Sequence, residues 1–365
     1  MHAQRSSRAA VAALPEPATH RRPVFLLLAV AMLVLATVSS LSLAPTAAAQ
    51  QTDAEATAAD VAERVGDTAV TVYTYTSGGM FSPGRTGREP TGAGSGWVYS
   101  DDGLVITNAH VVDGAEEILV VLSDGTQIPA SLVGSDWYQD VAVLQLEPEG
   151  DQELPPAATV GDSSLVRAGD QVIAIGTPLG QFANTVSVGH VGAVERSLNT
   201  GTGYSLRNLI QHDASLSPGN SGGPLYSMDG EVIGMNVAKV DALSSGQQST
   251  DDIGFAIDGN TVVAVAEEII ANGGVEHPYL GVTTQLTMQG SVIVSGIEDG
   301  APAAEAGLEP GDVIVGIDGQ SVDVTHPFID LLYEHDPGDT IVLTVERNGE
   351  QMDIAVELGA RPEGL

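Results

Sequence analysis

The sequence predicts a mostly β protein, with β-barrels or a sandwich in its larger part and a smaller domain after it. Between residues 68 and 236, many short runs of strand-forming residues alternate with turn signals. Glycine (43) and proline (19) are frequent among the 365 residues, which favours a turn-rich chain. Because 43% of the residues are hydrophobic, the chain can bury a sizeable core and does not belong to the disordered class.

The strands of the larger part are predicted where apolar and β-branched residues lie between turn signals. Asp101-Asp102-Gly103 and Ser123-Asp124-Gly125 are hairpin turn signals between pairs of such runs. A short helix is expected at 60–65, ended by Gly66, and 78–94 reads as a loop rich in Gly, Ser, Pro and Arg. The predicted strands are 68–76, 95–100, 104–108, 118–122, 126–134, 141–146, 171–176, 184–195, 209–211 and 231–236.

The spacing of apolar residues changes after residue 260. Residues 261–272 place apolar side chains at helical spacing, with Asn260 as the expected N-cap and Gly273-Gly274 as the stop. We expect this helix to close the larger domain before the second domain begins near His277.

The charge balance is strongly acidic. The chain has 13 Lys and Arg residues against 48 Asp and Glu residues, a net charge of −35, and Lys239 is its only lysine. This charge makes nucleic acid an unlikely partner, since one polyanion repels another. It fits either a solubilising surface or a protein that works in high salt, where repulsion is screened within roughly 3 Å at 1 M. The absence of cysteine excludes disulfides, zinc–thiolate sites and a cysteine nucleophile.

The N-terminus has the features of an export or anchoring segment. Residues 1–23 carry four arginines against one acid, and 24–38 is an almost unbroken apolar run. Ala47-Ala48-Ala49 offers a small-residue cleavage site, which would leave Gln50 as the first residue. If the segment is not cleaved, 24–44 is just long enough to span a bilayer as a membrane anchor. Both readings place the rest of the chain outside the cytoplasm.

Three separate stretches carry the residue types of a serine hydrolase. His110 ends a predicted strand, Asp140 precedes an apolar strand, and Ser221 lies between glycines in Gly219-Asn220-Ser221-Gly222-Gly223. A serine hydroxyl becomes a nucleophile when a neutral histidine takes its proton, and an acid can orient that histidine. Each residue alone is typical of a packed side chain or a turn, so the prediction rests on all three together.

The serine loop also predicts an oxyanion hole. Acyl transfer creates an oxyanion that needs backbone N–H donors, and Gly219 and Ser221 would supply them. Glycine at 219 lets the backbone turn and approach closely. The order His110, Asp140, Ser221 is that of the chymotrypsin plan and differs from the Ser-Asp-His order of α/β-hydrolases.

These motifs resemble those of the HtrA/Deg family of extracytoplasmic serine proteases. The similar stretches are 107–112 around the histidine, 140–144 around the aspartate, 217–225 around the serine and 254–257 before the linking helix. The resemblance implies a chymotrypsin/trypsin-like double β-barrel with the triad between the barrels, followed by a PDZ domain. It also implies homotrimers and a quality-control role on misfolded proteins.

The domains expected from this resemblance are a signal peptide or anchor at 1–49, a linker at 50–59, a protease domain at 60–274 and a PDZ domain at 277–361. His212 and Ser215-Leu216 depart from the family's commoner residues, and we expect a structural role for His212 in its strand. The segment 239–252 is longer and more polar than expected.

The residue six positions before the nucleophile is Ser215, where proteases that cleave after Arg or Lys carry an aspartate. Cleavage after basic residues is therefore not expected. A small or aliphatic P1 side chain is the prediction, and the resemblance implies the same. Apolar pockets discriminate weakly between such side chains, by about 1–3 kcal/mol per methylene, so specificity should be broad.

Tyr279-Leu280-Gly281-Val282 resembles the carboxylate-binding loop of PDZ domains in this family. The backbone N–H groups of Leu280, Gly281 and Val282 would bind a peptide C-terminus that adds as a strand. The alternative is that these residues only begin a buried strand. Further expected PDZ elements are a helix and strand within 301–319, a groove helix at 327–333 and the last main strand at 340–347, in a β-sandwich or partly open barrel with two helices.

The function predicted from these features is an ATP-independent serine endopeptidase acting on unfolded proteins or peptides. No cofactor is expected, because nucleotide-binding glycine motifs are absent and the histidines lack metal-ligand spacing. Two alternatives remain: a non-enzymatic chaperone or peptide-binding scaffold with the same fold, and an esterase that uses the same triad.

Overall fold

The computed structural model describes residues 56–76, 90–199, 204–237 and 253–361. The predicted N-terminal segment 1–49, most of the predicted loop 78–94 and all of 239–252 lie outside the described residues. Within the described part of the chain, no helix combines the length and apolar character needed to cross a bilayer.

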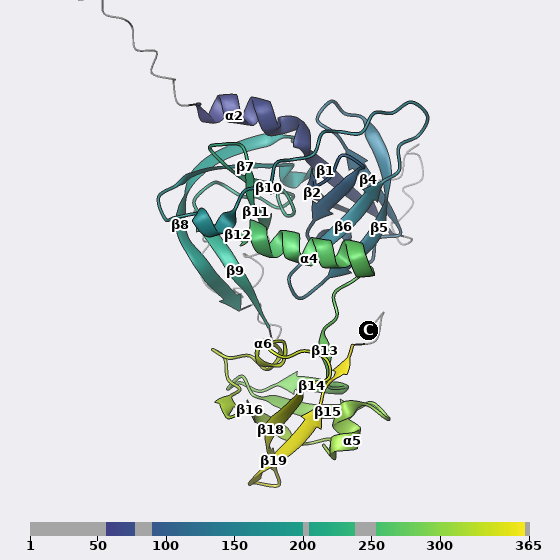
Figure 1. Ribbon diagram of the computed structural model, residues 1–365, viewed down its shortest axis with the longest axis vertical. Helices are drawn as coiled ribbons and strands as arrows, with labels where there is room; N and C mark the ends of the chain where they lie inside the picture. Colours follow the sequence, from purple (N-terminus) through teal and green to yellow (C-terminus); the bar gives the residue numbers. More distant parts are fainter. Residues whose placement is uncertain (1–55, 77–89, 200–203, 238–252, 362–365) are drawn as a thin grey trace, which may run out of the picture. The chain divides into compact units, whose positions relative to one another are not determined.

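The first six strands form a closed barrel in the order β1-β2-β3-β6-β5-β4 (Figure 1). The two predicted hairpins are confirmed, since β2 pairs with β3 and β4 pairs with β5. One expectation was wrong: Gly92 to Gly94 belong to β2, because Gly92 pairs with Thr74 of the neighbouring strand β1. The strands are β1 (Ala69–Tyr75), β2 (Gly92–Val98), β3 (Leu104–Thr107), β4 (Glu117–Val121), β5 (Gln127–Asp136) and β6 (Val141–Leu146).

The next six strands form a second closed barrel in the order β10-β11-β12-β9-β8-β7. Each barrel has its own buried cluster, and a larger cluster joins the two. Trp97 and Val143 from the first barrel meet Ile173 and Tyr226 from the second in that shared cluster. The strands are β7 (Gln171–Gly176), β8 (Thr185–Asn199), β9 (Ser205–His212), β10 (Pro224–Ser227), β11 (Val232–Val237) and β12 (Gly254–Asp258).

Two helices pack on the barrels. The first, α2 (Ala58–Val65), begins with a capping box between Thr57 and Asp60 and ends at Gly66, as predicted. The second, α4 (Gly259–Asn272), lies across both barrels, against β5, β6 and β11 (Figure 1).

The N-cap predicted for α4 was wrong, because Asp258 and not Asn260 caps the helix. The Asp258 carboxylate accepts the Thr261 amide, while the Asn260 side chain donates to Asp162 at 2.9 Å. Gly273 ends the helix in the left-handed region, at φ 82°, as a C-terminal glycine does.

The second domain has one main sheet in the order β14-β15-β16-β18-β19, so β14 is an edge strand. The predicted strand 340–347 is β18, but it is not the last main strand. Asn348-Gly349, both at positive φ, turns the chain so that β19 pairs along all of β18. The elements are β13 (Pro278–Tyr279), β14 (Val282–Leu286), β15 (Val292–Ile297), α5 (Pro302–Ala306), β16 (Val313–Ile317), β17 (Gln320–Ser321), α6 (Phe328–Leu332), β18 (Thr340–Arg347), β19 (Glu350–Glu357) and β20 (Gly359–Ala360).

Candidate active site

The structure brings His110 and Asp140 together at the end of the first barrel. His110 lies in the short helix α3 (Ala109–Val112) directly after β3, and its Nδ1 is 2.8 Å from Asp140 Oδ2 and 3.0 Å from Oδ1. The His110 backbone amide also donates to Asp140 Oδ1, at 3.0 Å. A neutral imidazole that donates its Nδ1–H to a carboxylate presents Nε2 as a base.

The backbone of Asp140 is held in the left-handed region, at φ 56°. The Asn108 side-chain amide donates to the Asp140 carbonyl at 2.8 Å, which helps to fix this uncommon conformation. The side chain of His110 is 23% exposed and that of Asp140 is 10% exposed. The pair is thus shielded on the carboxylate side and accessible on the imidazole side.

Ser221 lies in the loop between β9 and β10 of the second barrel, and it is bound to the first barrel. Its carbonyl accepts the Ser95 amide of β2 at 2.8 Å. The Ser95 carbonyl in turn accepts the Thr107 hydroxyl of β3 at 2.7 Å, three residues before His110. A Cβ on Gly222 would lie 2.3 Å from the Thr107 hydroxyl, so glycine is needed where the loop meets the histidine segment.

Hydrogen bonds also hold the serine loop within the second barrel. The Asn220 amide donates to the Ser217 carbonyl at 2.9 Å, and the Gly222 amide donates to the Asn236 carbonyl at the same distance. Ser221 itself is 6% exposed. The loop that carries Ser221 is therefore held by hydrogen bonds to both barrels.

Gly219, the predicted oxyanion-hole residue, has a backbone conformation that requires glycine. Its φ is 102°, and a Cβ there would lie 2.3 Å from the Thr177 carbonyl. The Leu179 amide donates to the Pro218 carbonyl at 2.6 Å. Because the C=O and N–H of a trans peptide point in opposite directions, the Gly219 N–H points away from Leu179. The Ser95 hydroxyl fixes the next peptide by donating to the Gly219 carbonyl at 2.7 Å.

His212 occupies the end of β9, as expected, and is 1% exposed. Burial lowers its pKa from 6.5 to about 4, while Asn236 and Asp213 oppose part of that change. A histidine kept neutral by burial fits the structural role predicted for it. No group of three or more metal-ligating side chains occurs among the described residues.

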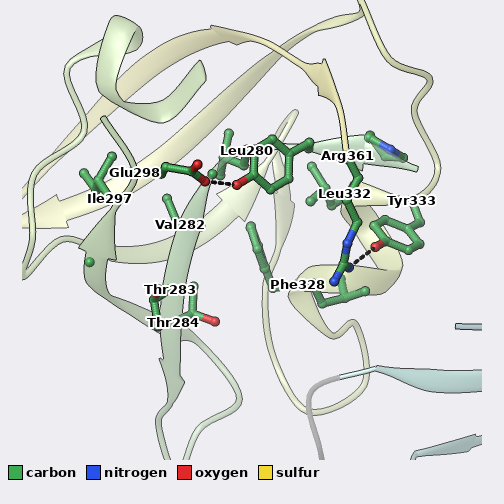
Figure 2. A pocket seen from close by; sticks show the side chains of 15 residues that line it. Leu280, Val282, Thr283, Thr284, Ile297, Glu298, Phe328, Leu332, Tyr333 and Arg361 are labelled. Carbon is green, nitrogen blue, oxygen red and sulfur yellow. Dashed lines mark hydrogen bonds between the residues drawn. The ribbon is translucent and has the colours of Figure 1, made fainter. Parts of the chain in front are cut away.

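The four residues of the predicted carboxylate loop all line one cavity of about 560 Å³ in the second domain (Figure 2). It lies between β14 and α6, with Phe328 and Leu332 on the helix side. Gly281 has φ 74°, and a Cβ there would lie 2.1 Å from the Ala301 Cβ, so only glycine fits. An extended peptide can add to the free edge of β14 in such a groove.

The turn that leads to Asp140 contacts the groove helix α6. The Tyr138 hydroxyl donates to the Asp330 carboxylate of α6 at 3.1 Å, and the Ser205 amide of β9 donates to the same group at 2.9 Å. Asp330 is 2% exposed. Burial and the Asp330 charge raise the pKa of Tyr138. The helix that lines the cavity is thus joined to the turn that leads to the catalytic candidate Asp140.

Several supporting residues carry no sequence signal of their own. Ser95, Thr177 and Asn236 hold the loops by contacts between distant segments. The only signal near them is the placement of Ser95 between Gly94 and Gly96, which allows close approach of another backbone.

Two family descriptions match the chain. Residues 94–235 match the trypsin-like peptidase domain, and residues 278–358 match the PDZ domain. Among curated proteins, it is 38% identical over 298 residues to the serine protease Do-like HtrA of Bacillus subtilis, covering 75% of this chain and 65% of that protein. It is 39% identical to the probable periplasmic serine endoprotease DegP-like of Halomonas elongata, covering 77% of this chain and 60% of that protein.

A third relative is covered more fully. The chain is 36% identical over 307 residues to the serine protease Do-like HtrA of Lactococcus lactis, covering 78% of this chain and 74% of that protein. Among solved structures, the HtrA-type protease AlgW with decapeptide has a TM-score of 0.60 and 32% identity, covering 84% of this chain and 99% of that one. The serine endoprotease from Yersinia pestis has a TM-score of 0.59 and 30% identity, with the same coverage.

Proposed function

The chain belongs to the HtrA/DegP family of serine proteases, and on that basis we propose that it is an ATP-independent endopeptidase that degrades unfolded or damaged proteins. The observation that carries this proposal is the His110–Asp140 pair on the first barrel, with the Ser221 loop bound to the same barrel through Ser95. The chain spans 65% and 60% of the first two relatives, so the activity of the whole protein is part of the proposal.

In the proposed mechanism, His110 Nε2 removes the proton of the Ser221 hydroxyl as Oγ attacks the carbonyl carbon of the substrate. The negative charge that develops on the carbonyl oxygen is stabilised by the N–H groups of Gly219 and Ser221. His110 then gives the proton to the leaving amine, and the C–N bond breaks to leave an acyl-enzyme. Water, deprotonated by the same histidine, hydrolyses the ester and restores Ser221. Asp140 keeps the imidazole oriented and stabilises its protonated form.

The second domain supplies a binding groove for peptide C-termini. The N–H groups of Leu280, Gly281 and Val282 would hold the terminal carboxylate, and the peptide would pair with the edge of β14. The cavity between β14 and α6 supports this role. We assign the protease domain to 60–274 and the PDZ domain to 277–361.

We place the protein outside the cytoplasm, either released after cleavage of 1–49 or anchored by it. Relatives named as periplasmic endoproteases support this location. The proposed assembly is a homotrimer, which light scattering of the purified chain can measure. A salt series in the activity assay distinguishes the two readings of the acidic surface: salt adaptation predicts activity that rises with salt up to molar concentration.

The test replaces Ser221 by alanine and follows degradation of unfolded casein, with and without peptides that occupy the PDZ groove. Loss of the nucleophile should reduce turnover by at least about 10⁴-fold, because triad members act as a unit. Ser217→Ala is the matched control, since only the backbone of Ser217 contacts Asn220 in the loop contacts described above. Degradation by Ser221→Ala at the wild-type rate would reject the proposed nucleophile.

A further inference from the structure

Arg361 places a positive charge beside the proposed carboxylate loop. It directly follows β20, and the pairing of β20 with β13 fixes this part of the chain next to Tyr279. The Arg361 amide donates to the His277 carbonyl at 3.0 Å, two residues before Tyr279. The position of the Arg361 backbone is therefore determined by the same strand pair that leads into the loop.

The guanidinium lines the groove together with the loop and the helix α6 (Figure 2). Its Nη1 atom is 3.4 Å from the Tyr333 hydroxyl, and its centre lies 5.1 Å from the centroid of the Trp137 ring. Among the residues that line this cavity, Arg361 and Glu298 are the charged ones. The Tyr279 hydroxyl donates to Glu298, so the acid is already hydrogen-bonded on the side of the groove away from Tyr333 in Figure 2.

The charge of Arg361 acts on both aromatic residues near the end of the groove. The hydrogen bond to Glu298 raises the pKa of Tyr279, and burial raises the pKa of Tyr333. The Arg361 charge opposes both changes. A carboxylate held between the loop and Tyr333 would feel the same positive charge.

We propose that Arg361 is a specificity-determining residue of the groove, which pairs with the free C-terminal carboxylate of a bound peptide. This inference rests on the proposed PDZ function. Because the chain has a net charge of −35, it repels a peptide carboxylate. Without a nearby cation, backbone N–H groups alone would have to offset this repulsion. The guanidinium of an arginine can add a charge-assisted, bidentate hydrogen bond to the carboxylate, which is stronger than a hydrogen bond between neutral groups.

The proposal defines the ligand as an extended peptide with an ionised C-terminus and an apolar last side chain. The apolar preference follows from Leu280, Val282, Phe328 and Leu332, which line the cavity. Amidated C-termini and internal segments would still pair with β14, but they would lack the ion pair. Arg361 should therefore affect discrimination between an acid and an amide, and not peptide binding in general.

The experiment measures this discrimination by fluorescence anisotropy. The probes are decapeptides labelled with fluorescein at the N-terminus and ending in Ala, Val, Leu or Phe, each made as the acid and as the amide. The protein is the full chain with Ser221→Ala, so that probes are not cleaved, with or without Arg361→Gln. Arg167→Gln, which removes an arginine whose side chain is 82% exposed, controls for the change in net charge.

Arg361→Gln should lower the affinity for the acid probes by about 10-fold. Its affinity for the amide probes should stay within about twofold of that of the parent. Arg361→Lys should keep more of the affinity for the acid probes than Arg361→Gln does. Arg167→Gln should change neither the affinity for the acid probes nor that for the amide probes. The unchanged amide affinity shows that the groove is still folded.

If Arg361→Gln lowered the affinity for acid and amide probes equally, or lowered neither, the role of Arg361 would be overturned while the proposed peptide-binding function would stand. If the parent protein bound none of the acid probes at millimolar concentration, the proposed peptide-binding function would fail as well.

Discussion

Acid should destabilise the second barrel through His212. The imidazole is 1% exposed at the end of β9. Burial lowers its pKa from 6.5 to about 4. In the unfolded chain the imidazole binds a proton as the pH falls below 6.5, whereas the folded protein accepts it only near pH 4.

The size of the effect follows from the two pKa values. The difference between 6.5 and about 4 corresponds to about 3 kcal/mol of unfolding free energy, at 1.36 kcal/mol per pKa unit. Because the pKa is lowered in the folded state, this stability is fully present above pH 6.5. It is lost progressively as the pH falls toward 4. A loss of this size is a large part of the stability of an ordinary domain.

The assay is urea denaturation between pH 7 and pH 4.5, with Ser221→Ala in every variant to prevent self-cleavage. The many carboxyl groups titrate equally in the parent and in His212→Gln, so the difference between the two isolates His212. We expect the parent to lose about 2–3 kcal/mol more than His212→Gln over this range. His190→Gln, which replaces an exposed histidine in β8, should keep the parental pH dependence. Identical pH profiles for the parent and His212→Gln would refute the reasoning.

Three further substitutions test the site and its contacts. Asp140→Asn should lower kcat on unfolded casein by about 10⁴-fold, because the amide no longer favours the Nδ1–H tautomer of His110; a smaller loss than tenfold would contradict this. Gly219→Ala, whose Cβ would lie 2.3 Å from the Thr177 carbonyl, should reduce turnover by at least about 100-fold, measured in the same assay. Asp330→Ala should raise the hydrogen-exchange rate of the Ser205 amide by about 10-fold or more, and Glu334→Gln, a change at a half-exposed carboxylate, should not.

The strands and the candidate site residues could be predicted from the sequence where the information is local. The hairpins of the first barrel are marked by Asp-Gly turns, and the serine loop is marked by the glycines around Ser221. Where two neighbouring residues could play the same local role, the sequence did not show which one does. Both Asp258 and Asn260 can cap a helix, and the choice depends on Asn260 reaching Asp162, which lies 98 residues away.

Elements decided by distant contacts were not predictable. Gly92 to Gly94 have weak strand propensity, yet they form a strand because β1 pairs with them. The Ser95 hydroxyl donates to the carbonyl of Gly219, which lies 124 residues later in the predicted oxyanion loop. Tyr138 and Asp330, which are hydrogen-bonded, lie 192 residues apart in the sequence. Such contacts depend on how the barrels and the second domain pack, and no local pattern encodes them.

The most direct test of peptide hydrolysis by this site is the position and rate of labelling by a fluorophosphonate, mapped by peptide mass spectrometry. We predict one phosphonyl group per chain, on Ser221, with labelling slowed by orders of magnitude in His110→Ala. Labelling of a different residue, or an unlabelled Ser221 in a preparation that degrades casein, would contradict the assignment.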